Sequence, residues 1–145
     1  MASERIPVNP QVKYGFLAII AAQAMHSTEE YLAQLYEVFA PARFISGLLT
    51  DDLPVGFLIV NSAVVLIGVW CYLFRVRPGH KSAVGWMWFW IIFEGANGIG
   101  HVLLAINAGA YFPGLLTAFL LILTTGYLAW TRSYVDFGNN TIQRS

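Results

Sequence analysis

The chain contains four long apolar segments, and these constrain its fold more than any other feature. They cover about residues 10–36, 54–74, 82–106 and 113–134. A helix needs about 20 residues to cross a hydrocarbon layer of roughly 30 Å. Charged residues make up only 11% of the chain, whereas a soluble domain typically has about 25%. We therefore predict an all-α fold, a four-helix transmembrane bundle that forms one integral membrane domain over residues 1–145.

Two of these segments begin with recognisable helix-start signals. Asn9 can cap the first helix, and Pro10 follows it as a first helical residue. Asp51 or Asp52 can cap the second, which then begins at Pro54. Short polar side chains accept hydrogen bonds from the free N–H groups of a first turn, and proline is tolerated there because its missing N–H would be unpaired anyway.

The basic residues predict how the chain is oriented in the membrane. Cytoplasmic loops of membrane proteins carry an excess of lysine and arginine. Seven of the eight basic residues fall in the N-terminal region, between the second and third segments, or towards the C-terminus: Arg5, Lys13, Arg75, Arg77, Lys81, Arg132 and Arg144. We therefore expect a multi-pass protein with both termini on the same, cytoplasmic side of a plasma membrane or bacterial inner membrane.

Several function classes find no support in the sequence. It contains no P-loop, no GxGxxG pattern and no basic amphipathic segment, so we expect no nucleic-acid partner. A single cysteine, Cys71, excludes an internal disulfide. The expected partners are the lipid bilayer and a lipophilic small molecule, and the oligomeric state stays open.

The first apolar segment carries three ionisable residues where charge is costly. The stretch "AMHSTEEYL" places His26, Glu29 and Glu30 late in the predicted helix. Residues three and four apart lie on one face of a helix, so the three side chains project together. Ionisable groups inside a membrane are rare and usually functional. The segment therefore carries a candidate site.

The third apolar segment carries a matching polar stripe. Glu94, Asn97 and His101 follow one another at spacings of three and four residues in "EGANGIGH". At about 1.5 Å per residue, this stripe reaches the depth of His26, because the first and third helices run in the same direction. Asn61 of the second helix lies at a similar depth. These side chains are expected to share one interior site.

Two of these stretches resemble the signature motifs of a known family. "HSTEE" at 26–30 and "NGIGH" at 97–101 are similar to the motifs of the HXXEE family of small integral membrane proteins. The resemblance implies a functional polar site, enzymatic in character, but it names no substrate. By the family pattern this site includes His26, Glu29, Glu30, Asn97 and His101, and position in the sequence adds Glu94 and Tyr111.

These residues favour two kinds of chemistry. Histidine and carboxylate ligands on facing helices can hold zinc, iron or manganese, and the candidate ligands are His26, Glu30, Glu94 and His101. Alternatively, a metal-free site could work by acid and base catalysis. The candidate catalytic residues are His26, Glu29, Glu30, Glu94, Asn97 and His101, with Asn61 and Tyr111 supporting them.

We expect the site to serve an enzyme. Its substrate would be a lipophilic sterol-like, isoprenoid or acyl compound, and its reaction an isomerisation, hydration or hydrolysis. Two alternatives remain open. Intramembrane glutamate and histidine also relay protons or metal ions in transporters, and a buried polar cluster can simply stabilise a non-catalytic membrane protein.

Overall fold

Helices make up nearly all of the described chain. The structure is a computed structural model that describes the backbone of residues 5–142 and the side chains of residues 5–132. The elements are α1 (Pro10–Leu32), α2 (Leu35–Val38), α3 (Ala40–Gly47), α4 (Leu53–Cys71), the π-helical turn η1 (Tyr72–Val76), α5 (Ala83–Ala108) and α6 (Leu115–Ile142). No strand occurs within residues 5–142, apart from one isolated bridge between Arg5 and His80. The all-α prediction is confirmed.

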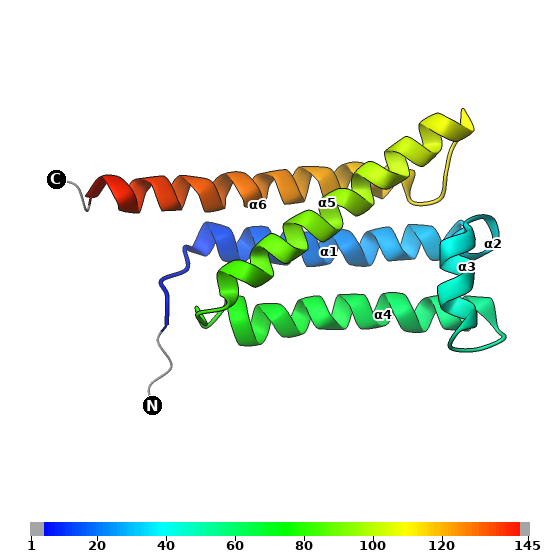
Figure 1. The fold of residues 1–145 in the computed structure, drawn as a ribbon, viewed down its shortest axis with the longest axis horizontal. Coiled ribbons are helices and arrows are strands. Elements are labelled where there is room, and N and C mark those ends of the chain that lie inside the picture. The colour runs from blue at the N-terminus through cyan, green and yellow to red at the C-terminus, as the bar shows by residue number, and fades with distance from the viewer. Residues whose placement is uncertain (1–4, 143–145) are drawn as a thin grey trace.

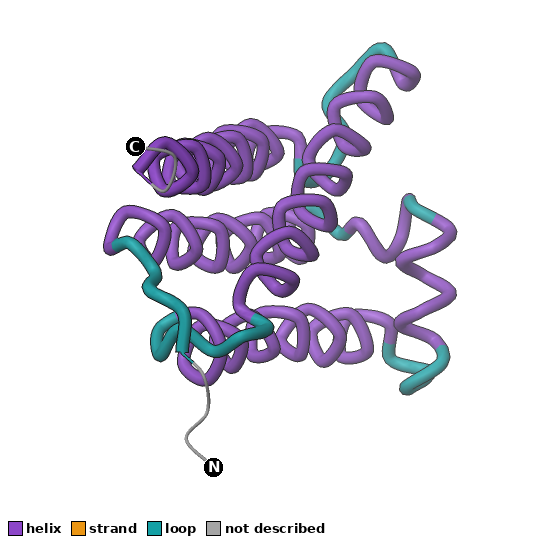
Figure 2. The backbone as a smooth tube through the Cα atoms, turned by 60° about the vertical axis from the view of Figure 1, so that its left-hand side comes forward, coloured by secondary structure: helices purple, strands orange, loops and turns teal. Residues whose placement is uncertain are grey.

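Helix α1 occupies the middle of the bundle. It lies between α4 and α6, and α5 crosses the group diagonally (Figure 1). The short helices α2 and α3 sit at the end of the bundle opposite the start of α1, with α3 running across the direction of the long helices (Figures 1 and 2). Helix α5 packs mainly on α6, whereas α4 packs on α1 and α3. The first turn of α1 and the far end of α6 lie at the same end of the bundle (Figure 1).

Three stretches of this bundle are long and apolar enough to cross a membrane. They are Leu53–Val76, Ala83–Ala108 and Leu115–Arg132. Large apolar side chains such as Leu58 and Leu66 are exposed on their outer faces, as expected for surfaces that contact lipid. These features indicate a membrane protein.

Helix α1 does not reach the hydropathy of a candidate span. Its interior positions include Gln23, His26 and Glu30, all buried. These polar side chains lower its hydropathy, and the surrounding helices shield them. The prediction of four transmembrane helices is therefore supported for three helices. The cytoplasmic location of the termini stays a prediction.

The first predicted helix, 10–36, is wrong at its C-terminal end. Helix α1 stops at Leu32, and Gln34 has a left-handed backbone with φ of 56°. A right-handed helix cannot continue through such a residue. The chain then forms α2, an extended residue at Phe39, and α3 with Pro41 in its first turn. Both short helices were missed in the sequence.

The other boundaries differ by smaller amounts. The helix expected over 54–74 is α4 followed by η1, and the one expected over 82–106 is α5. The helix expected to start at residue 113 starts at Leu115. Both helix-start signals hold: Asn9 Oδ1 accepts a hydrogen bond from Gln11 N at 2.9 Å, and Asp52 Oδ1 accepts one from Val55 N at 3.2 Å.

An apolar core fills the half of the bundle that contains the start of α1. Phe16, Ile19, Met87, Trp90 and Leu128 are each no more than 2% exposed and belong to one cluster. They come from α1, α5 and α6, upstream of the polar residues on α1 and α5. The polar site is therefore confined to the half of the bundle beneath α2 and α3.

Candidate metal centre

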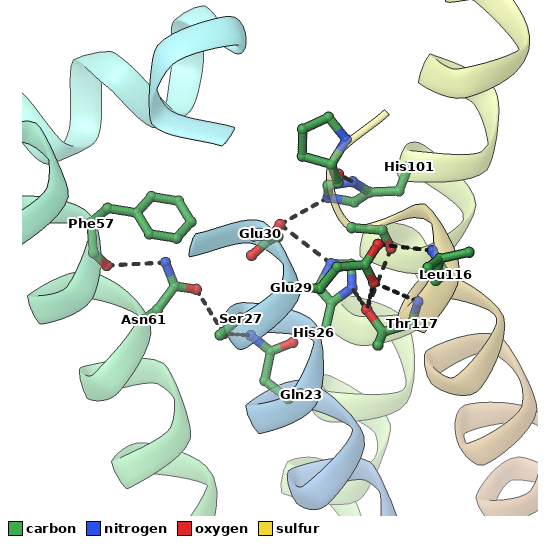
Figure 3. A network of polar contacts seen from close by, with 12 residues as sticks. Gln23, His26, Ser27, Glu29, Glu30, Phe57, Asn61, His101, Leu116 and Thr117 are labelled. Carbon is green, nitrogen blue, oxygen red and sulfur yellow. Dashed lines mark hydrogen bonds and ion pairs between the residues drawn. The ribbon is translucent and has the colours of Figure 1, made fainter. Parts of the chain in front are cut away.

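The last two turns of α1 direct their ionisable side chains to different neighbours. His26 and Glu30 lie four residues apart on the face that points into the bundle, and both are buried. Glu29 points towards the start of α6 (Figure 3). One short helical segment thus supplies two inward groups and one carboxylate directed at another helix.

His101 of α5 completes a group of three around a single carboxylate oxygen. Glu30 Oε1 lies 3.3 Å from His26 Nε2 and 3.0 Å from His101 Nε2 (Figure 3). The two imidazole rings meet edge to face, with centroids 4.6 Å apart. The predicted pairing of the polar faces of the first and third long helices is present for these three residues.

The hydrogen bond of His101 defines its tautomer. His101 Nδ1 lies 2.6 Å from the carbonyl oxygen of Pro113. A carbonyl oxygen can only accept, so Nδ1 carries the hydrogen and donates it. In a neutral imidazole, Nε2 then presents a lone pair to Glu30.

His26 has the same tautomer, assigned through Thr117. The Thr117 hydroxyl lies 2.5 Å from Glu29 Oε2 and 2.8 Å from His26 Nδ1. Its single hydrogen goes to the carboxylate, because charge-assisted O–H···O⁻ bonds have such short distances. The hydroxyl oxygen must therefore accept from His26 Nδ1–H. In the neutral ring, this leaves the His26 Nε2 lone pair facing Glu30.

Glu29 secures the start of α6. Its carboxylate accepts hydrogen bonds from Leu116 N at 3.1 Å, Thr117 N at 2.8 Å and the Tyr111 hydroxyl at 2.8 Å. Free N–H groups at a helix start attract negative charge. Burial raises the pKa of the Tyr111 hydroxyl, and the adjacent Glu29 raises it further, so Tyr111 remains a donor. Glu29 thereby positions Thr117, which positions His26.

Three candidate ligand atoms therefore converge in a buried space. One atom from each of His26, Glu30 and His101 lies within 4.8 Å of the others. Among the described residues, His26 Nε2 has no hydrogen-bond partner, although Glu30 is near. Metal-bound histidines typically donate their other N–H to a carbonyl, carboxylate or water, which fixes the ring. Both rings are fixed in this way, so the group could hold a metal ion.

The close approach of the two rings depends on a glycine. Gly114 has φ of +91°, a backbone conformation that side chains disfavour. A Cβ atom there would lie 2.7 Å from His101 Nδ1 and 2.8 Å from His26 Cε1. Gly114 thus makes room for both imidazoles. Its neighbour Pro113 supplies the carbonyl that holds His101.

Glu94 is fully buried but does not join this group. With its amide nitrogen facing Glu94, Gln23 donates to Oε2 at 2.7 Å and to Oε1 at 3.3 Å. In the same orientation the Gln23 amide oxygen accepts from Ser27 Oγ at 3.0 Å, and Ser27 Oγ lies 2.8 Å from Asn61 Oδ1. The polar network therefore extends from α5 through α1 to α4. Among the predicted metal ligands, Glu94 alone lies outside the close group.

A cavity of about 580 Å³ adjoins the group of three. Glu30 and His101 form part of its wall, together with the amides of Gln23, Asn61 and Asn97. Its other lining residues are mostly apolar and come from α3, α4 and α5. Cavities of roughly 300–1,000 Å³ with a few polar groups are typical of small-molecule sites.

The chain can be assigned to a family that is defined by the motif at this site. A family described as a protein of unknown function with an HXXEE motif matches residues 17–129, more than half of the chain. The chain belongs to the HXXEE family. Its HXXEE motif is His26-Ser27-Thr28-Glu29-Glu30. No curated protein and no solved structure matches the chain.

The residues of the HXXEE motif have two different roles in this structure. Its histidine and second glutamate face His101, whereas its first glutamate holds the start of α6. The predicted supporting residues Asn61 and Tyr111 each make a hydrogen bond to this network. Asn97 lines the cavity.

Four contributors were missed in the sequence. Gln23 and Ser27 lie on the same helical face as the HXXEE motif residues, and their spacing of four residues could have revealed them. Thr117 and Gly114 reach the site through the fold of the α5–α6 connection. The sequence around them shows no comparable signal.

Proposed function

We propose that His26, Glu30 and His101 bind a divalent metal ion, and that this HXXEE protein is a membrane enzyme acting on a lipophilic substrate. The observation that carries the proposal is the tautomer assignment. Both Nδ1–H groups are committed to Thr117 and Pro113, so in the neutral rings two Nε2 lone pairs face one carboxylate oxygen. Such an arrangement needs a shared cation, either protons or a metal ion.

Of the three candidate metals, zinc, iron and manganese, the ligand set favours zinc or ferrous iron. Two imidazoles and one carboxylate are the protein ligands of many catalytic zinc sites and of non-haem iron sites. Manganese favours sets richer in oxygen ligands. A bound ion of this kind polarises a carbonyl group or lowers the pKa of a bound water.

The residues of the chain would supply the rest of the site. Thr117 and the Pro113 carbonyl orient the two histidines, and Asn97 on the cavity wall can donate to or accept from a substrate oxygen. The apolar wall excludes water from the reacting group. Isomerisation, hydration or hydrolysis of a sterol-like, isoprenoid or acyl compound fits these parts. Without a metal, Glu30 and His101 would exchange a proton as base and acid.

The packing favours an enzyme over a transporter. A transporter of protons or metal ions needs a polar path to both membrane surfaces. Here Phe16, Ile19 and Trp90 are packed between the site and the end of the bundle that contains the start of α1. The polar network therefore has the form of a closed pocket.

A purely structural role for the polar cluster is also less well supported. Polar side chains that only join helices are expected to satisfy one another, because a buried unpaired polar atom costs about 1–3 kcal/mol. The contact of His26 Nε2 with Glu30 Oε1 spans 3.3 Å and does not form a hydrogen bond. An ion bound between the two atoms would satisfy both.

Elemental analysis of the purified protein tests the proposal. Wild-type protein, never exposed to chelator, is compared with His26→Ala and His101→Ala variants, and zinc and iron are measured per chain. His80→Ala is the matched control, because His80 contacts Arg75 and Ser82 outside the site. We expect near-stoichiometric metal in wild type and His80→Ala and its loss in the other two. Equal metal content in all four proteins, or none in wild type, would refute the metal centre.

A further inference from the structure

We propose that the substrate of this centre is an uncharged lipid that reaches the cavity sideways from the bilayer, between α4 and α5. The inference rests on the proposed function, because it takes the cavity to serve the metal centre. Beyond the proposed function, it specifies that the substrate is uncharged and by which path it enters the cavity.

Helices α1 to α5 surround the cavity, and they leave one side poorly closed. Helix α1 forms the inner wall with Gln23 and Glu30, and α3 covers one end with Ala42 and Ser46. Helices α4 and α5 supply the two remaining walls. These helices contact each other at the end away from α3, where Trp70 meets Trp86, and they diverge towards α3 (Figure 1).

The margin of the cavity is apolar and exposed. Ile92 and Phe93 of α5 line it and are 66% and 43% exposed, and Ile45 of α3 is 46% exposed. α4 and α5 are both candidate membrane spans, so exposed apolar side chains between them face hydrocarbon. A route with such a margin admits a lipid from the side.

The charges at the site disfavour an anionic lipid. Three carboxyl groups lie in or beside the polar network, those of Glu29, Glu30 and Glu94. Among the residues that the structure describes, no lysine or arginine lines the cavity. A divalent ion bound to Glu30 would keep at most one positive charge, and no basic side chain among the described lining residues would add to it for a phosphate or sulfonate head group. Burying an unpaired charge is strongly unfavourable.

The nearest arginine at this end of the bundle is already engaged. Arg43 of α3 donates hydrogen bonds to the carbonyl groups of Tyr36 and Glu37 and pairs with the Glu37 carboxylate. It does not line the cavity. It is therefore committed to the turn between α2 and α3.

The polar groups of the cavity suit one neutral oxygen function. One amide hydrogen of Asn61 goes to Phe57 O, and the second hydrogen can be donated to a ligand oxygen. Asn61 and Asn97 lie on opposite walls, α4 and α5. An alcohol, ketone or ester group placed between them would also be near Glu30 and His101. The apolar remainder of the lipid would occupy the rest of the cavity and extend between the helices.

Photolabelling in vesicles tests this inference. The probes are a diazirine-bearing long-chain alcohol and its sulfonate of equal chain length, each in phosphatidylcholine vesicles containing the full-length protein. We expect the alcohol to label α4 and α5 at least about tenfold more strongly than the sulfonate, given the cost of an intramembrane charge. Mapped sites should cluster at the residues that line the cavity. Equal labelling by both probes, or labels spread evenly over the lipid-facing surface, would refute it.

A pair of variants tests the route. Ala96→Phe adds bulk to the cavity wall, and Ala63→Phe adds the same bulk to an exposed position on α4 outside the cavity. We expect Ala96→Phe to reduce labelling by the alcohol about tenfold, because the added ring would obstruct the exposed margin of the cavity on α5. Ala63→Phe should label as wild type does. Unchanged labelling in a folded Ala96→Phe protein would refute the route. If that variant does not fold, the comparison of the two probes in the wild-type protein still tests the inference.

Labelling and metal content separate this inference from the proposed function. The wild-type labelling is repeated after chelator treatment, with zinc and iron measured in the same samples. Metal at the site with no preference for the alcohol would refute the lipid inference alone. Preferential labelling in a protein that never holds metal would support the cavity and refute the metal centre.

Discussion

Replacing Gly114 by alanine is expected to disrupt the site through both histidines at once. The added Cβ would lie 2.7 Å from His101 Nδ1 and 2.8 Å from His26 Cε1, whereas ordinary contact begins at 3.4 Å. The rings or the backbone must therefore move by about 0.7 and 0.6 Å, the differences 3.4 − 2.7 and 3.4 − 2.8. Binding sites tolerate displacements of only about 0.5 Å. The positive φ adds strain of about 1–3 kcal/mol.

Gly109→Ala provides the matched control for this change. Gly109 also has a positive φ, +61°, but nothing lies within 4 Å of the Cβ that alanine would add. Both variants carry backbone strain, and only Gly114→Ala crowds the rings. Zinc affinity is measured by competition with a chelator in detergent, and thermal unfolding is followed in parallel. We expect a loss of about 10–100-fold in affinity for Gly114→Ala, as when other groups that orient metal ligands are changed, and wild-type affinity for Gly109→Ala. Wild-type affinity in Gly114→Ala would refute the assignment of the two rings to one site.

Three further predictions concern the supports of the site. Thr117→Val should weaken zinc binding about 10–100-fold in the same chelator competition, because His26 Nδ1–H loses its acceptor. Thr124→Val is the control and should bind zinc as wild type does, because the Thr124 hydroxyl contacts only its own helix. Gly56→Ala should loosen α3 from α4, since the added Cβ would collide with the Ser46 carbonyl, and hydrogen exchange should rise in α3 and not in α1. The Glu94→Gln variant should contain nearly one zinc per chain by elemental analysis, because Glu94 lies outside the three ligands. Loss of metal in a folded variant would show that Glu94 is a ligand.

The helical fold could be predicted because its signals are local. Segment length and apolar composition mark the long helices, and the Asn9 and Asp52 caps mark two starts. The break after Leu32 could not be predicted in the same way. It depends on a left-handed Gln34, a conformation that its residue type does not favour. The side chains that follow it, Leu35 and Tyr36, are buried against Phe57 of α4.

The site was predictable as far as helical periodicity reaches. His26, Glu30 and His101 share faces that the spacing alone defines, and the structure brings them together. The role of Glu29 was not predictable, because it depends on where α6 begins in space. Depth and helical phase placed Glu94 beside the others. It lies in the same polar network, in contact with Gln23, but outside the close group of three.

X-ray absorption spectroscopy at the metal edge tests the central claim most directly. It is applied to purified protein as isolated, or loaded with one equivalent of zinc, alongside the His101→Ala variant. The account predicts two imidazole ligands with light-atom distances of about 2.0–2.1 Å, and one fewer imidazole in the variant. A sulfur shell at about 2.3 Å would place the metal at Cys71, which is buried in the apolar core cluster. That result, or a spectrum unchanged in His101→Ala, would contradict a centre formed by His26, Glu30 and His101.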